Sequence, residues 1–194
     1  MRPIVFLLLL IALPTWADSP LRVAVAANFR QVLEQINAGF TASTGQSVVL
    51  SSASTGVLYS QIIHGAPFDV FFAADQATPA LLTDAPSTPF CYARGSLVLT
   101  GGNSNLQDLA NGELSLAIAN PTTAPYGRAA SEILARPEFS AAQGRKLVRG
   151  SNVVQAYQFW HSGGTDLALV PRALAPEATP IPTAWHQPIE QHAV

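Results

Sequence analysis

Charge is scarce in this sequence: of its 194 residues, 10 are Lys or Arg and 12 are Asp or Glu. Charged residues make up 11% of the chain, against about a quarter in an average domain, and the basic residues form no cluster. Binding to the phosphate backbone of a nucleic acid depends on such a cluster. We therefore expect no nucleic-acid partner, and we expect polar contacts to come from hydroxyls, amides and the backbone.

The usual signs of catalysis and of metal binding are also missing. The single cysteine, Cys91, has no partner for an internal disulfide. The histidines show neither HExxH spacing nor acidic neighbours at the spacing of metal ligands. No G-x-S-x-G segment occurs, and the serines in residues 51–54 have no histidine close to them in the sequence. The sequence thus predicts a protein that is not an enzyme, with no metal site formed by its side chains and no cofactor.

Apolar runs long enough to cross a bilayer are absent as well, because a spanning helix needs about 20 apolar residues. Residues 4–13 form a shorter run, with Arg2 before it and Thr15 and Ala17 after it. Small residues at these two positions are typical of a signal peptidase site. The pattern predicts a cleaved secretory signal over residues 1–17 and an exported, soluble chain.

The rest of the sequence alternates between short β-prone runs and helical apolar periodicity. Residues 21–26 predict a strand, and apolar side chains at positions 29, 32, 33, 36 and 40 predict a helix that ends at Gly45. Further strands are expected at 47–51, 69–73, 97–100, 115–119, 146–149 and 166–170, and further helices at 57–64, 127–134 and 153–161. Consecutive βαβ units form parallel sheets covered by helices. Two small α/β lobes accommodate this pattern, with proline-rich loops or crossovers at 78–89 and 171–188.

The turns between strands and helices are polar, small and uncharged. In open parallel sheets, ligands bind at the carboxyl ends of strands, where the free N–H groups of the next helix point outward. The turns in question are residues 26–29, 51–56, 120–127 and 150–153, and their possible side-chain donors are Asn28, Ser54, Thr55 and Ser151. Each turn alone can be explained by helix N-caps. If the turns converge in a cleft between two lobes, they form a site for an anion.

Several segments resemble periplasmic molybdate-binding proteins of ABC importers. They are AVAANF at 24–29, VVLSSASTGVLYSQI at 48–62, GAPFDVFFAADQ at 65–76, IANPTTAPYGRAA at 118–130 and SNVVQA at 151–156. The resemblance implies an α/β, two-lobed type II periplasmic binding protein fold, in which each lobe is a mainly parallel sheet flanked by helices and the ligand cleft lies between the lobes. It also implies that residues 18–93 and 188–194 form lobe I and that residues 94–187 form lobe II.

The same resemblance implies a set of ligand-binding residues. The family's positions fall on Asn28, Thr55, Tyr126 and Val153, of which the last two act through their backbone N–H groups. Ser54 is a neighbour of this set, and Ala27 stands where close relatives can offer a hydroxyl. The implied function is capture of molybdate, and of tungstate of nearly the same size, for the membrane permease of an ABC importer. The implied protein is a periplasmic monomer that binds molybdenum only as the oxyanion.

Elementary chemistry agrees with such a ligand. Molybdate and sulfate are fully ionised at neutral pH and need only donors, whereas phosphate keeps a proton and requires an acceptor. The polar turns contain no Asp or Glu. Asp69 and Asp75 flank an expected strand, and we expect them to cap or pair locally. Discrimination between molybdate and sulfate would then depend on the size of the cavity.

One implication of the resemblance leaves the function open. Residues 187–194 resemble the strand that returns from the second lobe to the first, and relatives continue beyond it with helical segments. The first lobe is then expected to keep one apolar face uncovered. The alternative is a degenerate or truncated exported α/β domain with a structural or interaction role and no transport function.

Overall fold

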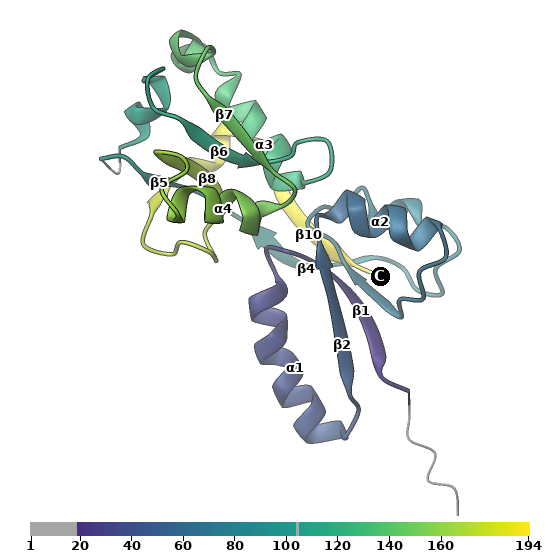
Figure 1. Ribbon diagram of the computed structural model, residues 1–194. Coiled ribbons are helices and arrows are strands. Elements are labelled where there is room, and N and C mark those ends of the chain that lie inside the picture. The colour runs from purple at the N-terminus through teal and green to yellow at the C-terminus, as the bar shows by residue number, and fades with distance from the viewer. Residues whose placement is uncertain (1–18, 104) are drawn as a thin grey trace, which may run out of the picture.

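Two lobes make up the computed structural model, which describes residues 19–103 and 105–194 (Figure 1). Each lobe is built on a five-stranded sheet, with strand order β2-β1-β3-β10-β4 in the first and β7-β6-β8-β5-β9 in the second. The expected two-lobed α/β fold is confirmed. The predicted signal segment lies outside the described residues. Within the described ranges, the helices are all too short or too polar to span a membrane.

The first lobe combines parallel strands with two that run the other way. Strand β1 pairs in parallel with β2 and β3, and β10 pairs antiparallel with β3 and β4. Helices α1 and α2 follow β1 and β2, as the βαβ pattern predicts. The bounds are β1 Leu21–Ala26, α1 Arg30–Thr44, β2 Val48–Ala53, α2 Thr55–Ile63, β3 Val70–Phe72, a short 3-10 helix Pro79–Leu81, β4 Phe90–Gly95 and β10 Ile189–Ala193.

The second lobe repeats this plan. Strand β6 pairs in parallel with β7 and β8, and β5 pairs antiparallel with β8 and β9. The bounds are β5 Leu97–Gly101, β6 Leu116–Ala119, α3 Pro125–Leu134, β7 Leu147–Gly150, α4 Val153–His161, β8 Leu167–Pro171 and β9 Thr179–Pro180. Short 3-10 helices cover Leu106–Ala110, Pro137–Ala142 and Thr183–Trp185. The larger apolar core is centred on this sheet and α3, and it extends to Ala26, Ala27 and Ala74 of the first lobe.

Both sheets are mixed, whereas the sequence predicted mainly parallel ones. The difference arises where the chain passes between lobes: β4 ends at Gly95 and β5 begins at Leu97, and β10 returns to pair with β4. A parallel pair requires a crossover connection, usually a helix, and strands that pass between the lobes without one can pair antiparallel. The lobe boundaries predicted at 93/94 and 187/188 stay a prediction.

Helix α1 forms as its periodicity predicts, but it buries little. It ends where Gly45 adopts a left-handed conformation with φ of 73° and donates its N–H to the Thr41 carbonyl. Leu33 is buried against the sheet, whereas Ile36 is 54% exposed and Phe40 39% exposed. Figure 1 shows this helix beside β2, at the edge of the first lobe. The apolar stripe therefore identified the helix without showing which of its residues are in the core.

This uneven burial predicts contrasting effects for two substitutions on α1. Leu33→Ala is expected to lower the free energy of unfolding by about 2 to 4 kcal/mol, because it leaves a cavity against the sheet. Ile36→Ala, a matched truncation on the exposed side, is expected to change it by no more than about 0.5 kcal/mol. Urea denaturation of both variants measures the difference. Equal losses would show that α1 packs differently from this structure.

Candidate functional site

The polar turns of both lobes meet at one small pocket. Parallel pairing brings the carboxyl ends of β1 and β2 to one edge of the first sheet, and those of β6 and β7 to one edge of the second. The pocket is lined by Ala26, Ala27, Asn28, Ser54, Thr55, Ala74, Ala124, Pro125, Tyr126, Asn152 and Val153. All the residues of the predicted set are among them. The turns thus converge as the strand ends predicted, and ligand binding at this pocket stays a prediction.

The pocket is compact and lacks formal charge. Its free volume is about 10 Å³, which is close to the minimum that holds one water molecule. Its lining includes no Asp, Glu, His, Lys or Arg. An anion of several atoms exceeds this volume, so the walls must move apart to admit one, and they offer it only neutral donors.

Ser54 contributes a hydroxyl that has no partner in the described part of the chain. It is the N-cap residue of α2, with extended backbone angles, yet its side chain makes no capping hydrogen bond. The residue is 4% exposed, and its Oγ is buried without a hydrogen-bond partner. A buried polar group left in this way costs about 1 to 3 kcal/mol. The hydroxyl is therefore available for a ligand.

Thr55 presents a second hydroxyl from the same turn. It is 1% exposed, and its Oγ1 accepts the backbone N–H of Ala74 at 2.9 Å. Since Oγ1 is the acceptor in that bond, its own hydrogen is free to be donated. The contact with Ala74, which follows β3, fixes the hydroxyl at the pocket wall.

Two backbone donors come from the second lobe. Helix α3 begins at Pro125, and the N–H of Tyr126 is the first that this helix offers. Helix α4 begins at Val153, and the side chain of the cap residue Asn152 accepts the N–H groups of Val154 and Gln155 but not that of Val153. Within the described residues, the N–H groups of Tyr126 and Val153 have no hydrogen-bond acceptor. Helix N-termini also carry partial positive charge, which favours an anion.

Asn28 is held by a residue that the sequence analysis missed. Its Nδ2 donates to Oε1 of Gln191 at 2.6 Å, which leaves the second Nδ2 hydrogen free. The Nε2 of Gln191 in turn donates to the Tyr126 hydroxyl at 3.4 Å. The signal was present in β10, where Ile189, Gln191 and Ala193 alternate as its buried residues. An amide among apolar residues on that face indicates a specific polar contact.

The phenols beside the pocket stay neutral over the physiological range. Burial raises the pKa of the Tyr126 hydroxyl well above its ordinary value. Burial is also the main cause of the raised pKa of Tyr92, with smaller contributions from the negative charges that Tyr126 and Cys91 acquire on ionisation. Ionised phenolates would repel an anion, so neutral tyrosines favour its binding.

The two predicted acidic neighbours are both engaged. Asp69 accepts the backbone N–H of Arg22 at 2.7 Å. Asp75 caps the N–H of Thr78 at 3.0 Å, and its other oxygen pairs with Arg128 Nη2 at 2.5 Å. The second contact joins the loop after β3 to α3 and so bridges the lobes. Asp75 therefore does more than the local pairing that we expected from the sequence.

A backbone contact also joins the lobes beside the pocket. The N–H of Gly56 in α2 donates to the carbonyl of Thr123 at 2.9 Å. A Cβ on Gly56 would lie 3.2 Å from the Thr123 Cα, so the turn has little room for a larger residue there. The lobes thus meet directly over the pocket.

Two residues of the expected turns contribute no side-chain donor. Ala27 lines the pocket with a methyl group, and its N–H is already bonded to the Ala53 carbonyl at 3.0 Å. Ser151 is exposed and lies outside the lining, which corrects its interpretation as a donor. The chain turns so that the next residue, Asn152, faces the pocket instead, because its side chain caps α4.

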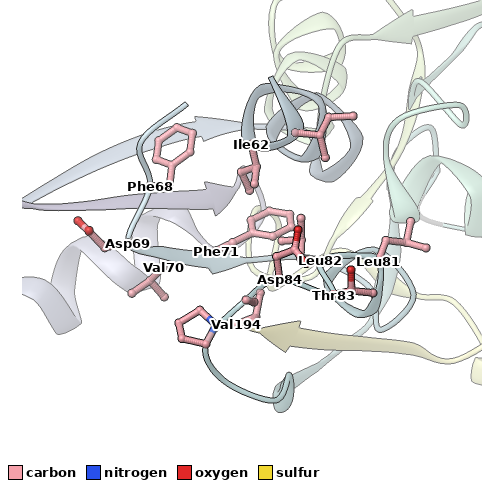
Figure 2. Close-up of a pocket in the computed structure, with 13 residues that line it drawn as sticks. Ile62, Phe68, Asp69, Val70, Phe71, Leu81, Leu82, Thr83, Asp84 and Val194 are labelled. Atoms are coloured by element: carbon pink, nitrogen blue, oxygen red, sulfur yellow. The ribbon is translucent and has the colours of Figure 1, made fainter. Parts of the chain in front are cut away.

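A much larger groove, about 480 Å³ in volume, opens beside α2 and β3 (Figure 2). Its walls are mostly apolar, and Figure 2 shows Phe68, Phe71, Leu82 and Val194 around it. The carboxylates of Asp69 and Asp84 also lie along the groove. It lacks the convergent donors of the small pocket and is an unsuitable site for an anion. Within residues 19–103 and 105–194, no group of three or more His, Cys, Asp or Glu can hold a metal ion.

Comparison with known proteins gives one consistent result. The sequence profile of the family described as bacterial extracellular solute-binding proteins matches residues 21–194. The chain is 38% identical to the molybdate-binding protein ModA of Azotobacter vinelandii in an alignment of 191 positions that covers 89% of this chain and 76% of that protein. It is 34% identical to ModA of Rhodobacter capsulatus in an alignment of 198 positions that covers 95% of this chain and 78% of that protein. The solved Azotobacter vinelandii periplasmic molybdate-binding protein superposes with a TM-score of 0.80, covering 90% of this chain and 84% of its own.

Proposed function

The chain belongs to the bacterial extracellular solute-binding proteins, among the relatives of ModA, and on this premise we propose that it captures molybdate for an ABC importer. It is a binding protein rather than an enzyme. We further infer that it works in the periplasm as a monomer, that it accepts tungstate, and that the membrane permease of the importer is its partner. Molybdate here is the transported ligand.

The observation that carries this proposal is the unpartnered Ser54 hydroxyl in a pocket without carboxylates. Together with Thr55, Asn28 and the N–H groups of Tyr126 and Val153, it forms a set of neutral donors from both lobes. A fully ionised tetrahedral oxyanion can accept from all of them at once. Protonated phosphate would need an acceptor, which these walls do not provide.

Capture depends on the division of the hydrogen-bond donors between the two lobes. Hydroxyls of the first lobe and helix N-termini of the second contact opposite sides of one ligand, so that full affinity requires the lobes to meet. Bonds to a charged acceptor are worth about 1.5 to 3 kcal/mol each, and the positive ends of the helices add to them. Because the pocket holds no fixed positive charge, the ligand can leave when the lobes separate at the permease.

Thermal unfolding with added anions tests the proposal. Residues 18–194 are heated with molybdate, tungstate, sulfate or phosphate in separate samples. A ligand at about a hundred times its dissociation constant stabilises the folded state by about 2.7 kcal/mol. We expect a higher midpoint with molybdate and tungstate only. A cooperative transition that none of the four anions shifts would contradict the proposal and favour a structural or interaction role.

Thr55→Ala is expected to weaken molybdate binding by about one to two decades, because it removes a hydroxyl that donates to a charged acceptor. Thr55→Ser is the matched control, since it keeps the hydroxyl and its bond from Ala74. Calorimetric titration of both variants gives the dissociation constants. If the serine variant loses as much affinity as the alanine variant, the hydroxyl is not a ligand donor.

The affinity for molybdate is expected to be constant between about pH 6.5 and 9, because no group lining the pocket titrates there. Burial raises the pKa of Tyr126, so the folded state keeps the phenol protonated where the unfolded chain would ionise it. This contribution to stability is present below about pH 10 and is lost as the pH rises further. Titrations across this range measure the affinity. A sharp change in affinity near pH 7 would reveal an ionisable ligand group that the structure does not place in the pocket.

A further inference from the structure

We propose that Gln191 is a positioning residue of the oxyanion site, which orients the Asn28 amide of the first lobe and engages the Tyr126 hydroxyl of the second. The inference rests on the proposed function and deepens it. Gln191 does not line the pocket, so it acts on the ligand only through the side chains of Asn28 and Tyr126. It acts from β10, the strand that returns from the second lobe to the first sheet.

The contacts of Gln191 define its orientation. Oε1 accepts from Asn28 Nδ2 at 2.6 Å, and the Tyr92 hydroxyl lies 3.2 Å from the same oxygen. Tyr92 also lies 2.9 Å from the Ala73 carbonyl, so that two acceptors share its hydrogen. Nε2 donates to Tyr126 at 3.4 Å. Rotating the Gln191 amide by 180° would set its NH2 group against the Asn28 donor, so the network selects one arrangement.

Gly95 leaves the space that the Tyr126 hydroxyl of this network occupies. Gly95 in β4 lies opposite Ile189 in β10, and a Cβ at Gly95 would overlap the Tyr126 hydroxyl. Gln191 itself is 4% exposed. A buried amide with its polar atoms engaged on residues of both lobes is more than a filler of apolar space.

Orientation of Asn28 matters because its amide has two unlike ends. While Gln191 accepts one Nδ2 hydrogen, the other is available to an anion. Without that acceptor the amide can turn and present its carbonyl oxygen, which repels an anion. Glutamine is suited to this position because it accepts from Asn28 and donates to Tyr126 at the same time, which neither Glu nor Leu can do.

A double-mutant cycle tests this role. Molybdate dissociation constants are measured for the wild type, Asn28→Ala, Gln191→Leu and the double variant, with the unfolding midpoint of each unliganded protein. Gln158→Leu is the matched control, because Gln158 is exposed on α4 and does not line the pocket. We expect Gln191→Leu alone to weaken binding about tenfold. In the Asn28→Ala background it should weaken binding less than threefold, because its effect passes through Asn28.

The outcomes separate the two proposals. Additive losses in the cycle, or an unchanged affinity in Gln191→Leu, overturn the positioning role while leaving molybdate capture intact. A tenfold loss that disappears in the Asn28→Ala background supports the role, because general damage to the fold would persist there. If the wild type binds neither molybdate nor tungstate, the proposed function fails and this inference fails with it.

Discussion

Ser54→Asp is expected to abolish measurable molybdate binding without weakening the fold. A carboxylate about 4 Å from a negative charge costs about 4 kcal/mol at an effective dielectric constant of about 20, and the second charge of molybdate increases this cost. The loss amounts to at least about three decades in affinity. The fold should tolerate the change because Ser54 is the N-cap of α2. Aspartate is among the best N-cap residues and also interacts favourably with the helix dipole.

Ser54→Asn is the matched control, since it has nearly the same volume and capping ability as the aspartate variant without the charge. We expect it to keep part of the affinity that the aspartate variant loses. Calorimetric titration and unliganded unfolding midpoints are measured for both. Strong molybdate binding by the aspartate variant would remove Ser54 from the site.

Replacing Val153 with proline is expected to weaken molybdate binding by about one to two decades, because it deletes one backbone donor to a charged acceptor. Position 153 is the first residue of α4, where proline is well tolerated. The preceding Asn152 has extended backbone angles, with φ of −154° and ψ of 179°, which proline favours in its neighbour. The cap bonds of Asn152 do not involve the N–H of Val153 and should remain. The variant therefore removes a single N–H from an otherwise intact helix.

Val153→Ala controls for the side chain. Val153 is buried in the main core, so its truncation lowers stability, but the N–H remains and the affinity should change by less than about threefold. Dissociation constants for the two variants decide between backbone and side-chain roles. Equal losses of affinity would rule out the backbone role at this position.

The sequence predicted the helix α4 and the convergence of the polar turns, for a clear physical reason. Strand periodicity, helix periodicity and turn chemistry are local, and the carboxyl ends of parallel neighbours meet at one edge. The turn that holds Thr55 could therefore be assigned to one edge of the first sheet and the turns that hold Tyr126 and Val153 to one edge of the second, whereas the sequence left their meeting across the lobes as a condition. Whether these residues bind the ligand stays a prediction that the variants above test.

The contacts that the sequence did not predict are long-range. Gln191 reaches Asn28 across 163 positions, and Arg128 reaches Asp75 across 53. No local pattern specifies which distant side chain completes a hydrogen bond. Strand β4 was missed for a related reason, since Phe90 and Cys91 are exposed and show no clean alternation. Its place depends on pairing with β10, which is determined only when the chain folds back.

The most direct test of molybdate capture is a crystal structure of the protein from crystals grown with molybdate, in which the molybdenum is located by its anomalous scattering. We expect one strong molybdenum peak in the small pocket between the lobes. The molybdate oxygens should lie within hydrogen-bond distance of the Ser54 and Thr55 hydroxyls and of the Tyr126 and Val153 nitrogens. A molybdenum peak elsewhere, or an empty pocket at saturating molybdate, would contradict molybdate capture at this site.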